Sequence, residues 1–331
     1  MEPLILVVIF ASFFCTYLII PFWIKKAKQI GLVWEDMNKP EKGKNVAGSG
    51  GITVIMGAMI GIFLYIALQT FYFKSIDGVS MSILAMLSTL LLVAGIGLID
   101  DLFGWKKGGL SKRSRIILIL FAAVPLMVIN AGESIMLGVN FGIWYPLLIV
   151  PLGILGATTT FNFLAGFNGL ETSQGIILLS ALAIVTYITG TSWLSVVALC
   201  LVASLIAFYI FNYNPAKIFP GDVLTYAIGA SIAAIAILGN AEKIALFFFI
   251  PYILETILKL RGNLKKQSFG IPNKDGSLEM PYDKIYGLEH LAIYILKRIK
   301  PSKKVYENDV VYLINGFQIV VIILGFVVFI I

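Results

Sequence analysis

Long apolar runs alternate with shorter polar stretches along the whole chain. A helix needs roughly 20 apolar residues to cross the hydrocarbon core of a bilayer. The alternation therefore predicts an all-α polytopic membrane protein with about ten transmembrane helices. The ten runs lie at about 3–24, 47–73, 80–99, 114–131, 145–164, 172–190, 193–212, 222–239, 243–258 and 311–331.

One polar stretch, 259–310, is much longer than the other connections between runs. We therefore expect a single integral membrane domain, 1–331, with a loop subdomain at 259–310 between the ninth and tenth spans. The ninth run is the weakest of the ten because it contains Pro251 and Glu255. Proline interrupts helical hydrogen bonding, and a carboxylate is costly in lipid.

Composition excludes a soluble protein, because 59% of the residues are apolar, only 13% are charged, and the mean hydropathy is +0.94. Soluble domains are nearer 45–50% apolar and about 25% charged. The net charge is +7, and outside the odd-numbered loops the basic residues are only Lys74 and Lys243. The positive-inside rule then places the odd-numbered loops and a functional site on the cytoplasmic face, with both termini outside. The positive charge reports topology, and we expect no nucleic-acid partner.

Two adjacent carboxylates, Asp100 and Asp101, close the third run. Such a pair at a membrane boundary is costly unless a cation or a basic partner offsets its charge. The loop that follows is basic and contains Lys106, Lys107, Lys112, Arg113 and Arg115. Interfacial anchoring and the topology signal explain the two groups separately, whereas a phosphate-and-metal centre requires both together.

Further polar residues lie at the end of the fifth run and at the start of the eighth. Asn162 needs a partner in its apolar setting, either another helix or a metal ion. Asn168 is also compatible with a turn, and Glu171 and Asp222 with favourable positions at helix N-termini. Their oxygen atoms equally suit Mg²⁺, a hard cation, and the ring of Phe219 is available to stack on a planar base.

Other kinds of chemistry are excluded by what the chain lacks. His290 is the only histidine, which excludes His-rich zinc catalysis, and no G-x-S-x-G or comparable nucleophile motif occurs. Carboxylates, amides and lysines at four loop edges suit phosphoryl transfer between a nucleotide diphosphate and a lipid-borne acceptor. In such a reaction, positioning and charge neutralisation do most of the catalytic work.

Three motifs occur in a distinctive order: Asp100-Asp101 with its basic loop, Asn162-x5-Asn168, and Phe219-x-Gly-Asp222. With them the chain resembles the polyprenyl-phosphate N-acetylhexosamine-1-phosphate transferase superfamily over nearly its whole length. It lacks the histidine-rich motif and the Asp-Gly-x-Asp element of the bacterial cell-wall branch. It is more similar to the dolichyl-phosphate N-acetylglucosamine-1-phosphate transferases of eukaryotes and archaea, on the strength of Asp36-Met37-Asn38-Lys39, Asn168-Gly169-Leu170-Glu171 and Leu278-Glu279-Met280.

The resemblance implies a reaction and a cofactor. UDP-N-acetylglucosamine would donate N-acetylglucosamine-1-phosphate to dolichyl phosphate and release UMP, an initiating step of lipid-linked glycan assembly for N-glycosylation. Asn162 and Asp222 would hold Mg²⁺, or Mn²⁺ in its place, on the donor pyrophosphate. Asn168 and Phe219 would grip the uracil.

Further roles follow by matching motif. Asp36 and Met37 would lie at the edge of the nucleotide, with Glu171 among the donor-binding residues. Lys112 would bind the acceptor phosphate, and the end of the fifth span, about 155–163, would line the path of the lipid. The resemblance leaves open whether Asp100 and Asp101 orient the acceptor or order the lysine and metal-bound water.

The chain departs from the family pattern at two places. Lys265 and Lys266 stand where the family has an Arg-x-Arg contact to the pyrophosphate, and lysine lacks the bidentate fork of arginine. Gly48 stands where related chains have a donor-binding glutamate.

Two rival functions remain: a multi-pass transporter, and a bacterial-type transferase acting on undecaprenyl phosphate. A transporter favours polar residues near the midplane and repeat symmetry, and the sequence has neither. We expect an archaeal cell membrane in preference to the endoplasmic reticulum. Anionic lipids are expected along the basic residues at 297–304, and a homodimer stays open.

Overall fold

The computed structural model describes residues 3–40, 45–74, 78–136 and 138–330. Among these residues, eight helices are long and apolar enough to cross a membrane, which confirms an all-α polytopic membrane protein. Two of them include a π-helical turn, η1 (Leu68–Tyr72) and η2 (Tyr145–Ile149). The eight spans are built on α1 (Pro3–Ile30), α2 (Gly51–Ala67), α3 (Val79–Lys107), α6 (Val150–Phe163), α7 (Leu170–Ile188), α8 (Ser192–Asn212), α9 (Gly221–Leu238) and α13 (Glu307–Phe329).

The other two predicted spans are each divided into two shorter helices. The fourth consists of α4 (Lys112–Ala122) and α5 (Val124–Val128), and the ninth of α10 (Glu242–Phe248) and α11 (Ile250–Arg261). A proline lies in the first turn of both α5 and α11. Proline has no N–H to continue the preceding helix, but it is well tolerated where a new helix begins. The break in the ninth run is therefore at the proline that weakened its prediction.

Two helices extend well beyond their apolar runs. Helix α1 continues to Ile30, and α3 continues to Lys107. The apolar pattern predicts that Asp100 and Asp101 close the third helix. In the structure they lie inside α3, about two turns before its end.

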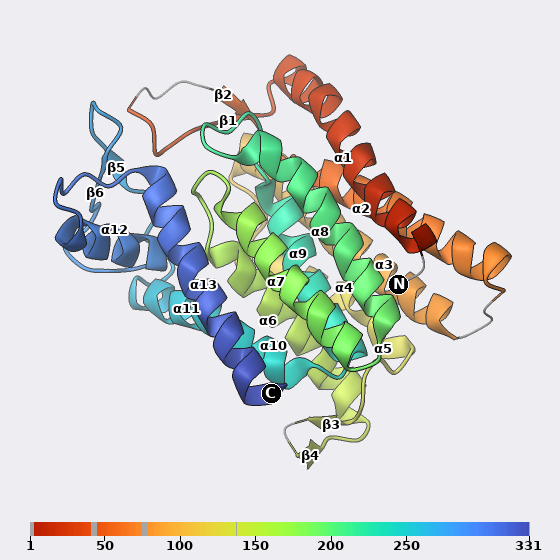
Figure 1. Ribbon diagram of the computed structural model, residues 1–331. Helices are drawn as coiled ribbons and strands as arrows, with labels where there is room; N and C mark the ends of the chain where they lie inside the picture. Colours follow the sequence, from red (N-terminus) through yellow and green to blue (C-terminus); the bar gives the residue numbers. More distant parts are fainter. Residues whose placement is uncertain (1–2, 41–44, 75–77, 137, 331) are drawn as a thin grey trace.

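Helix α9 lies within the bundle, surrounded by its neighbours in Figure 1, and its span is the most buried of the eight. Its backbone approaches two other helices closely. A Cβ atom at Gly97 of α3 would lie 2.5 Å from the Asp222 carbonyl oxygen, and one at Gly229 of α9 would lie 2.6 Å from that of Ala157 in α6. Glycine at these two contacts lets α3 and α6 pack against α9, so that polar residues of three helices meet.

Short sheets occupy the two ends of the bundle (Figure 1). Strands β1 (Val33–Glu35) and β2 (Asn45–Ala47) pair antiparallel at one end, and so do β5 (Ile271–Pro272) and β6 (Leu278–Glu279). At the other end lies the hairpin of β3 (Ile135–Met136) and β4 (Val139–Asn140).

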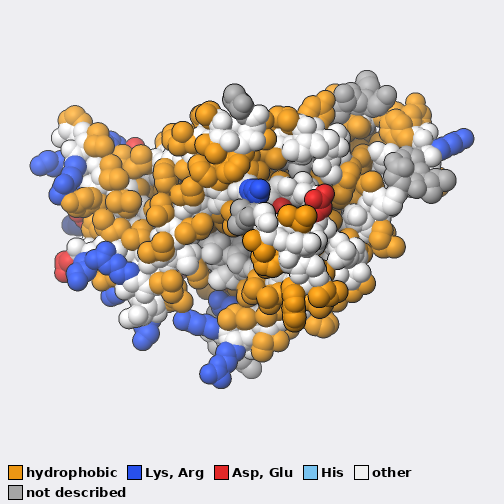
Figure 2. Space-filling view, turned by 90° about the horizontal axis from the view of Figure 1, so that it is seen from below, with side chains coloured by type: hydrophobic (Ala, Val, Ile, Leu, Met, Phe, Trp, Pro, Cys, Tyr) orange, Lys and Arg blue, Asp and Glu red, His pale blue; other side chains and the backbone are white. Residues whose placement is uncertain are grey.

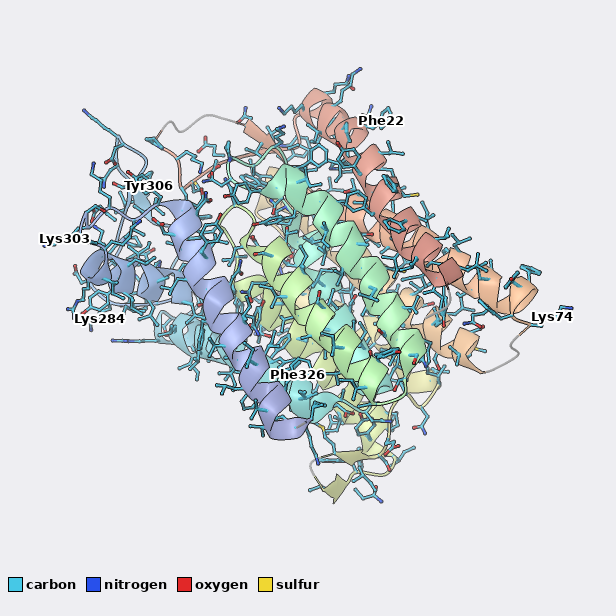
Figure 3. All side chains as sticks on the ribbon, in the orientation of Figure 1. Phe22, Lys74, Lys284, Lys303, Tyr306 and Phe326 are labelled. Carbon is cyan, nitrogen blue, oxygen red and sulfur yellow. The ribbon has the colours of Figure 1, made fainter. Side chains whose placement is uncertain are left out.

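The long connection spans residues 262–306, from the end of α11 to the start of α13, and contains β5, β6 and helix α12 (Leu288–Ile299). Lys284 and Lys303 lie on its outer side, whereas Lys74 lies at the opposite end of the molecule (Figure 3). Figure 2 shows hydrophobic side chains over most of one face, with Lys and Arg gathered mainly at the left and lower edges.

Candidate active site

A cavity of about 570 Å³ opens among the β1 segment, the α6–α7 loop, the start of α9 and the long connection. Its walls include seven of the residues that the sequence singles out. They are Asp36, Met37, Asn162, Asn168, Glu171, Phe219 and Asp222. Residues nearly 190 positions apart in the chain therefore share one cavity, which we call the main cavity.

A second cavity of about 280 Å³ adjoins the main cavity. Asp100, Asp101 and Arg115 line it, and it shares Asp222 and Phe219 with the main cavity. We call it the acidic cavity. The carboxylate-bearing Asp222 therefore lies where the two spaces meet.

Backbone contacts explain how Phe219 and Asp222 reach this border. The Phe219 N–H donates to the Ala47 carbonyl at 2.8 Å, and the Gly50 N–H donates to the Phe219 carbonyl at 2.9 Å. The segment before α9 is thereby fixed against the segment that leads from β2 into α2. The aromatic ring and the first turn of α9 are carried to the cavities as one unit.

Asp101 caps the N-terminus of α9 from a different helix. Its carboxylate accepts the Asp222 N–H at 2.8 Å and the Val223 N–H at 3.4 Å. The first N–H groups of a helix have no partner within the helix and favour a negative charge. Asp222 was an N-cap candidate from its sequence position, but the N-cap position of α9 is occupied by Pro220 and Asp222 is the second residue of the helix. The capping role thus falls to Asp101.

The Asp100 carboxylate accepts three hydrogen bonds. Two come from the Leu110 N–H at 2.7 Å and the Tyr226 hydroxyl at 3.0 Å. Arg115 supplies the third, with Nη2 donating to Oδ1 at 2.9 Å. Its Nε lies 2.6 Å from Oδ2, a close ion-pair contact without hydrogen-bond geometry. Asp100 and Arg115 therefore form a charge-assisted pair.

Lys112, the predicted acceptor-phosphate ligand, is exposed at the first position of α4 and lines neither cavity. The cation that reaches Asp100 is Arg115, three residues later. Residues three apart lie on the same side of a helix. A helix predicted to begin at Lys112 would therefore have indicated Arg115 as a second candidate for this contact.

The residues predicted to bind a metal ion meet in the main cavity. The Asn162 carboxamide oxygen accepts the Thr225 hydroxyl at 2.8 Å, which orients the amide. The described residues contain no cluster of three or more His, Cys, Asp or Glu able to hold a metal by themselves. Asn162 and Asp222 supply oxygen atoms only, which fits Mg²⁺, an ion commonly bound by one or two carboxylates together with substrate phosphates.

The opposite part of the main cavity is built on Asn168. Its side-chain Nδ2 donates to Asp36 Oδ2 at 2.9 Å, and its backbone N–H donates to Glu307 Oε1 at 2.7 Å. Glu171, in the first turn of α7, accepts the Gly166 N–H at 2.8 Å. Asp36 and Asn168 are therefore hydrogen-bonded to each other in this wall, and Glu171 holds the backbone of the same loop at Gly166. Glu307 is an additional partner that sequence patterns did not indicate.

Lys265 and Lys266, the predicted pyrophosphate contacts, lie apart from that wall. Both are exposed, and the Lys266 ammonium lies 4.6 Å from the ring centroid of Tyr282. Lys266 lines a chamber of about 230 Å³ that shares Asn162 and Gln267 with the main cavity. Lys265 lines neither this chamber nor the two cavities.

Gly48, which stands where related chains have a glutamate, packs closely against Trp34. A Cβ atom there would lie 2.6 Å from the indole ring of Trp34. Trp34 lines both cavities, although no sequence motif indicated it. A glutamate at position 48 and the observed position of Trp34 are therefore incompatible.

An apolar groove of about 290 Å³ runs along α6, α9, α10 and α11. Gly156, Ala157 and Thr160 line it, and all three fall within the predicted path of the lipid at 155–163. Glycine and alanine keep this surface shallow, and its walls are almost entirely hydrocarbon.

The fold and the joined cavities define a polytopic membrane enzyme with an acidic site at one end of its helix bundle. The chain belongs to glycosyl transferase family 4, whose model matches residues 83–240. The matched segment runs from α3 to just beyond α9 and so includes Asp100, Asp101, Asn162 and Asp222. The protein is therefore a transferase, which decides against the transporter alternative.

Relatives in archaea and a eukaryote match most of the chain. It is 40% identical over 296 residues, 87% of this chain and 88% of the relative, to a Saccharolobus solfataricus protein provisionally named UDP-N-acetylglucosamine–dolichyl-phosphate N-acetylglucosaminephosphotransferase. A Sulfolobus acidocaldarius protein with the same provisional name is 32% identical over 330 residues, 98% and 95% of the two chains. The Dictyostelium discoideum enzyme of that name is 29% identical over 304 residues, 79% and 72% of the two chains.

Proposed function

We propose that this protein transfers N-acetylglucosamine-1-phosphate from UDP-N-acetylglucosamine to dolichyl phosphate. The products are UMP and dolichyl-diphosphate N-acetylglucosamine, the first lipid-linked intermediate of N-glycan assembly. The observation that carries the proposal is the meeting of two cavities at Asp222. One is large and has amide, aromatic and carboxylate walls, and the other has an arginine–carboxylate pair. The names of the relatives agree with this donor and this acceptor.

The donor lies in the main cavity in this proposal. Asn168 and Phe219 hold the uracil, with Asp36 and Met37 at the edge of the nucleotide and Glu171 fixing the loop behind it. Lys265 and Lys266 neutralise the phosphates from the long connection, for which Lys266 is the better placed because it lines the adjoining chamber.

The pyrophosphate lies beside Asn162 and Asp222, which would hold Mg²⁺ there. Mn²⁺, which also accepts carboxylate and carbonyl oxygen ligands, would substitute for it. When bound, the ion neutralises charge on the pyrophosphate oxygens.

The acceptor phosphate lies in the acidic cavity, close to Arg115. One of its oxygen atoms attacks the phosphorus that carries the sugar, and a new oxygen–phosphorus bond forms. The bond from that phosphorus to the oxygen it shares with the UMP phosphate breaks, and UMP leaves. The acceptor is already largely ionised at pH 7, so no base is required for the attack.

The surrounding residues of the acidic cavity position the acceptor. Asp100 fixes the Arg115 guanidinium, Asp101 fixes the first turn of α9, and Lys112 stands outside as a further cation that attracts the lipid phosphate. The isoprenoid chain lies along the apolar groove at Gly156, Ala157 and Thr160.

The basic loops place this site on the cytoplasmic face, with both termini outside. The cell membrane of an archaeon is the proposed location, in preference to the endoplasmic reticulum, because two archaeal relatives match most of the chain. A bacterial-type transferase acting on undecaprenyl phosphate is the second candidate, since the acidic cavity recognises only a phosphate.

An assay with purified protein in detergent tests the proposal. The protein is incubated with Mg²⁺, a panel of UDP-sugars, and dolichyl or undecaprenyl phosphate. We expect UMP and a lipid diphosphate sugar, fastest with UDP-N-acetylglucosamine and dolichyl phosphate. Release of UDP would indicate simple glycosyl transfer and would overturn the proposal. A preference for undecaprenyl phosphate would favour the second candidate.

A further inference from the structure

Asn38 joins two loops that lie far apart in the sequence. Its side chain is only 2% exposed and does not itself line the main cavity. Its Nδ2 donates to the Gly166 carbonyl at 2.9 Å, and its Oδ1 accepts the Gly270 N–H at 3.1 Å. One carboxamide thus satisfies a backbone acceptor in the α6–α7 loop and a backbone donor in the long connection.

The two loops that Asn38 joins are adjacent walls of the main cavity. Gly166 and Asn168 of the first loop and Gln267 and Phe269 of the second all line it. They also touch directly, because a Cβ atom at Gly166 would lie 2.8 Å from the Phe269 ring. Gly166 has a φ of +113°, which favours glycine over any residue with a side chain. The width of the cavity is therefore set where these loops meet.

Glu307 fixes the same walls from the other end of the long connection. It is the first residue of α13, next to Tyr306 at the start of that helix in Figure 3, and it is 3% exposed. Its carboxylate accepts the Asn168 N–H at 2.7 Å and forms an ion pair with Lys39. Lys39 also donates to the Asn214 side chain. The long connection is thus tied to residues 38 and 39 at Gly270 and again at Glu307.

Burial makes these contacts specific. A buried polar group without a partner costs free energy comparable to a lost hydrogen bond, so each loop is most stable where Asn38 or Glu307 meets it. A carboxamide donates from its nitrogen and accepts at its oxygen at once, as both loops require here. Aspartate at position 38 would lose the donor and place a second carboxylate beside Glu307, whose Oε1 is 3.5 Å from Asn38 Nδ2.

We propose that Asn38 and Glu307 are positioning residues for the nucleotide sugar: they hold the α6–α7 loop and the long connection in the relative position at which the donor fits the cavity that both loops line. They act through Gly166, Asn168 and Gly270 and do not themselves touch the substrate. The proposal rests on the proposed function, because it assigns the donor to the main cavity.

Steady-state kinetics of Asn38→Leu, Asn38→Asp and Glu307→Gln test this inference on the full chain in detergent. The KM for UDP-N-acetylglucosamine should rise about tenfold or more, from the loss of buried hydrogen bonds. The kcat at saturating donor and the KM for the lipid phosphate should stay within about threefold. Asn308→Leu is the matched control, because Asn308 adjoins Glu307 but its side chain donates to the Tyr213 hydroxyl, away from the two loops. It should leave all three parameters unchanged.

A merely structural role predicts a different result: lower kcat and lower thermal stability, with an unchanged KM for the donor. That result would overturn the inference. Hydrogen exchange of the wild-type protein provides a second measurement that does not depend on folding of the variants. Addition of UMP should slow exchange at 166–170 and 267–270 together, and protection of only one loop would also overturn the inference. A wild-type protein that neither binds UMP nor releases it would instead refute the proposed function.

Discussion

Replacement of Arg115 tests most directly which cation binds the acceptor phosphate, Arg115 or Lys112. The family resemblance implies that Lys112 binds the acceptor phosphate, whereas the structure has Arg115 lining the acidic cavity. Arg115→Met removes the cation and leaves Asp100 without its ion pair. Arg115→Lys keeps the charge but removes the planar guanidinium group.

Two separate losses follow from the geometry. Breaking a buried ion pair costs about 3–5 kcal/mol. The Asp100 side chain is 1% exposed, but that of Arg115 is 34% exposed, so water replaces part of the interaction. We therefore expect Arg115→Met to lower the free energy of unfolding by about 2 kcal/mol. Loss of a charge-assisted contact to the acceptor phosphate, about 1.5–3 kcal/mol, should raise the KM for the lipid phosphate roughly 10- to 100-fold.

The assay measures the KM for dolichyl phosphate at saturating donor, with UMP affinity measured by calorimetry. Arg115→Lys should show a smaller rise in this KM than Arg115→Met, and both variants should bind UMP normally. The double variant Arg115→Met/Asp100→Asn should recover stability, because no carboxylate is left unpaired, but not the affinity for the acceptor. A normal acceptor KM in Arg115→Met, or a larger defect in Lys112→Ala, would refute the placement of the acceptor beside Arg115.

Three further outcomes are expected. Asp222→Ala should abolish transfer with the protein still folded in detergent; retained activity, with a loss of about 1 kcal/mol of stability, would reduce Asp222 to a helix-terminus residue. Gly48→Glu should displace Trp34 and raise the KM for the donor at least about tenfold; an unchanged KM would show that Trp34 is dispensable. Burial lowers the pKa of His290 to about 4, from about 6.5 in the unfolded chain, so protonation opposes folding. Stability should therefore fall by about 3 kcal/mol between pH 6.5 and pH 4, as seen by thermal unfolding. His290→Gln should remove that loss, and an equal loss in the variant would exclude His290 as its source.

The membrane fold was predictable because each long apolar run must form a helix in the hydrocarbon core of the bilayer. Every backbone polar group must be satisfied inside the lipid, so a run of about 20 apolar residues becomes a helix whatever surrounds it. Pro251 also marked correctly where the ninth run breaks. The run ends were less predictable, because α1 and α3 continue past the lipid-compatible residues. Once begun, a helix extends at little cost, and hydropathy does not detect its polar turns.

The motif residues were predictable as a group. Asp36, Asn162, Asn168 and Asp222 do share one cavity, because each follows or precedes a membrane helix on the same face. Loop alternation alone brings such residues to one end of a bundle. The presence of carboxylates, amides and cations there already favoured phosphate chemistry.

Only the tertiary structure decided which side chain meets which. Arg115 and not Lys112 reaches Asp100, because the packing of α4 along α3 decides which of two residues on the same side of α4 lies beside the carboxylate. Asp101 caps α9 because close packing at Gly97 brings two helices into contact. Asn38 joins two loops more than a hundred residues away from it in sequence. The sequence by itself determined the spans and the chemical groups at their ends, since lipid and helix geometry act locally. The pairing of those groups depends on helix placement and loop closure, which arise only when all the helices pack together.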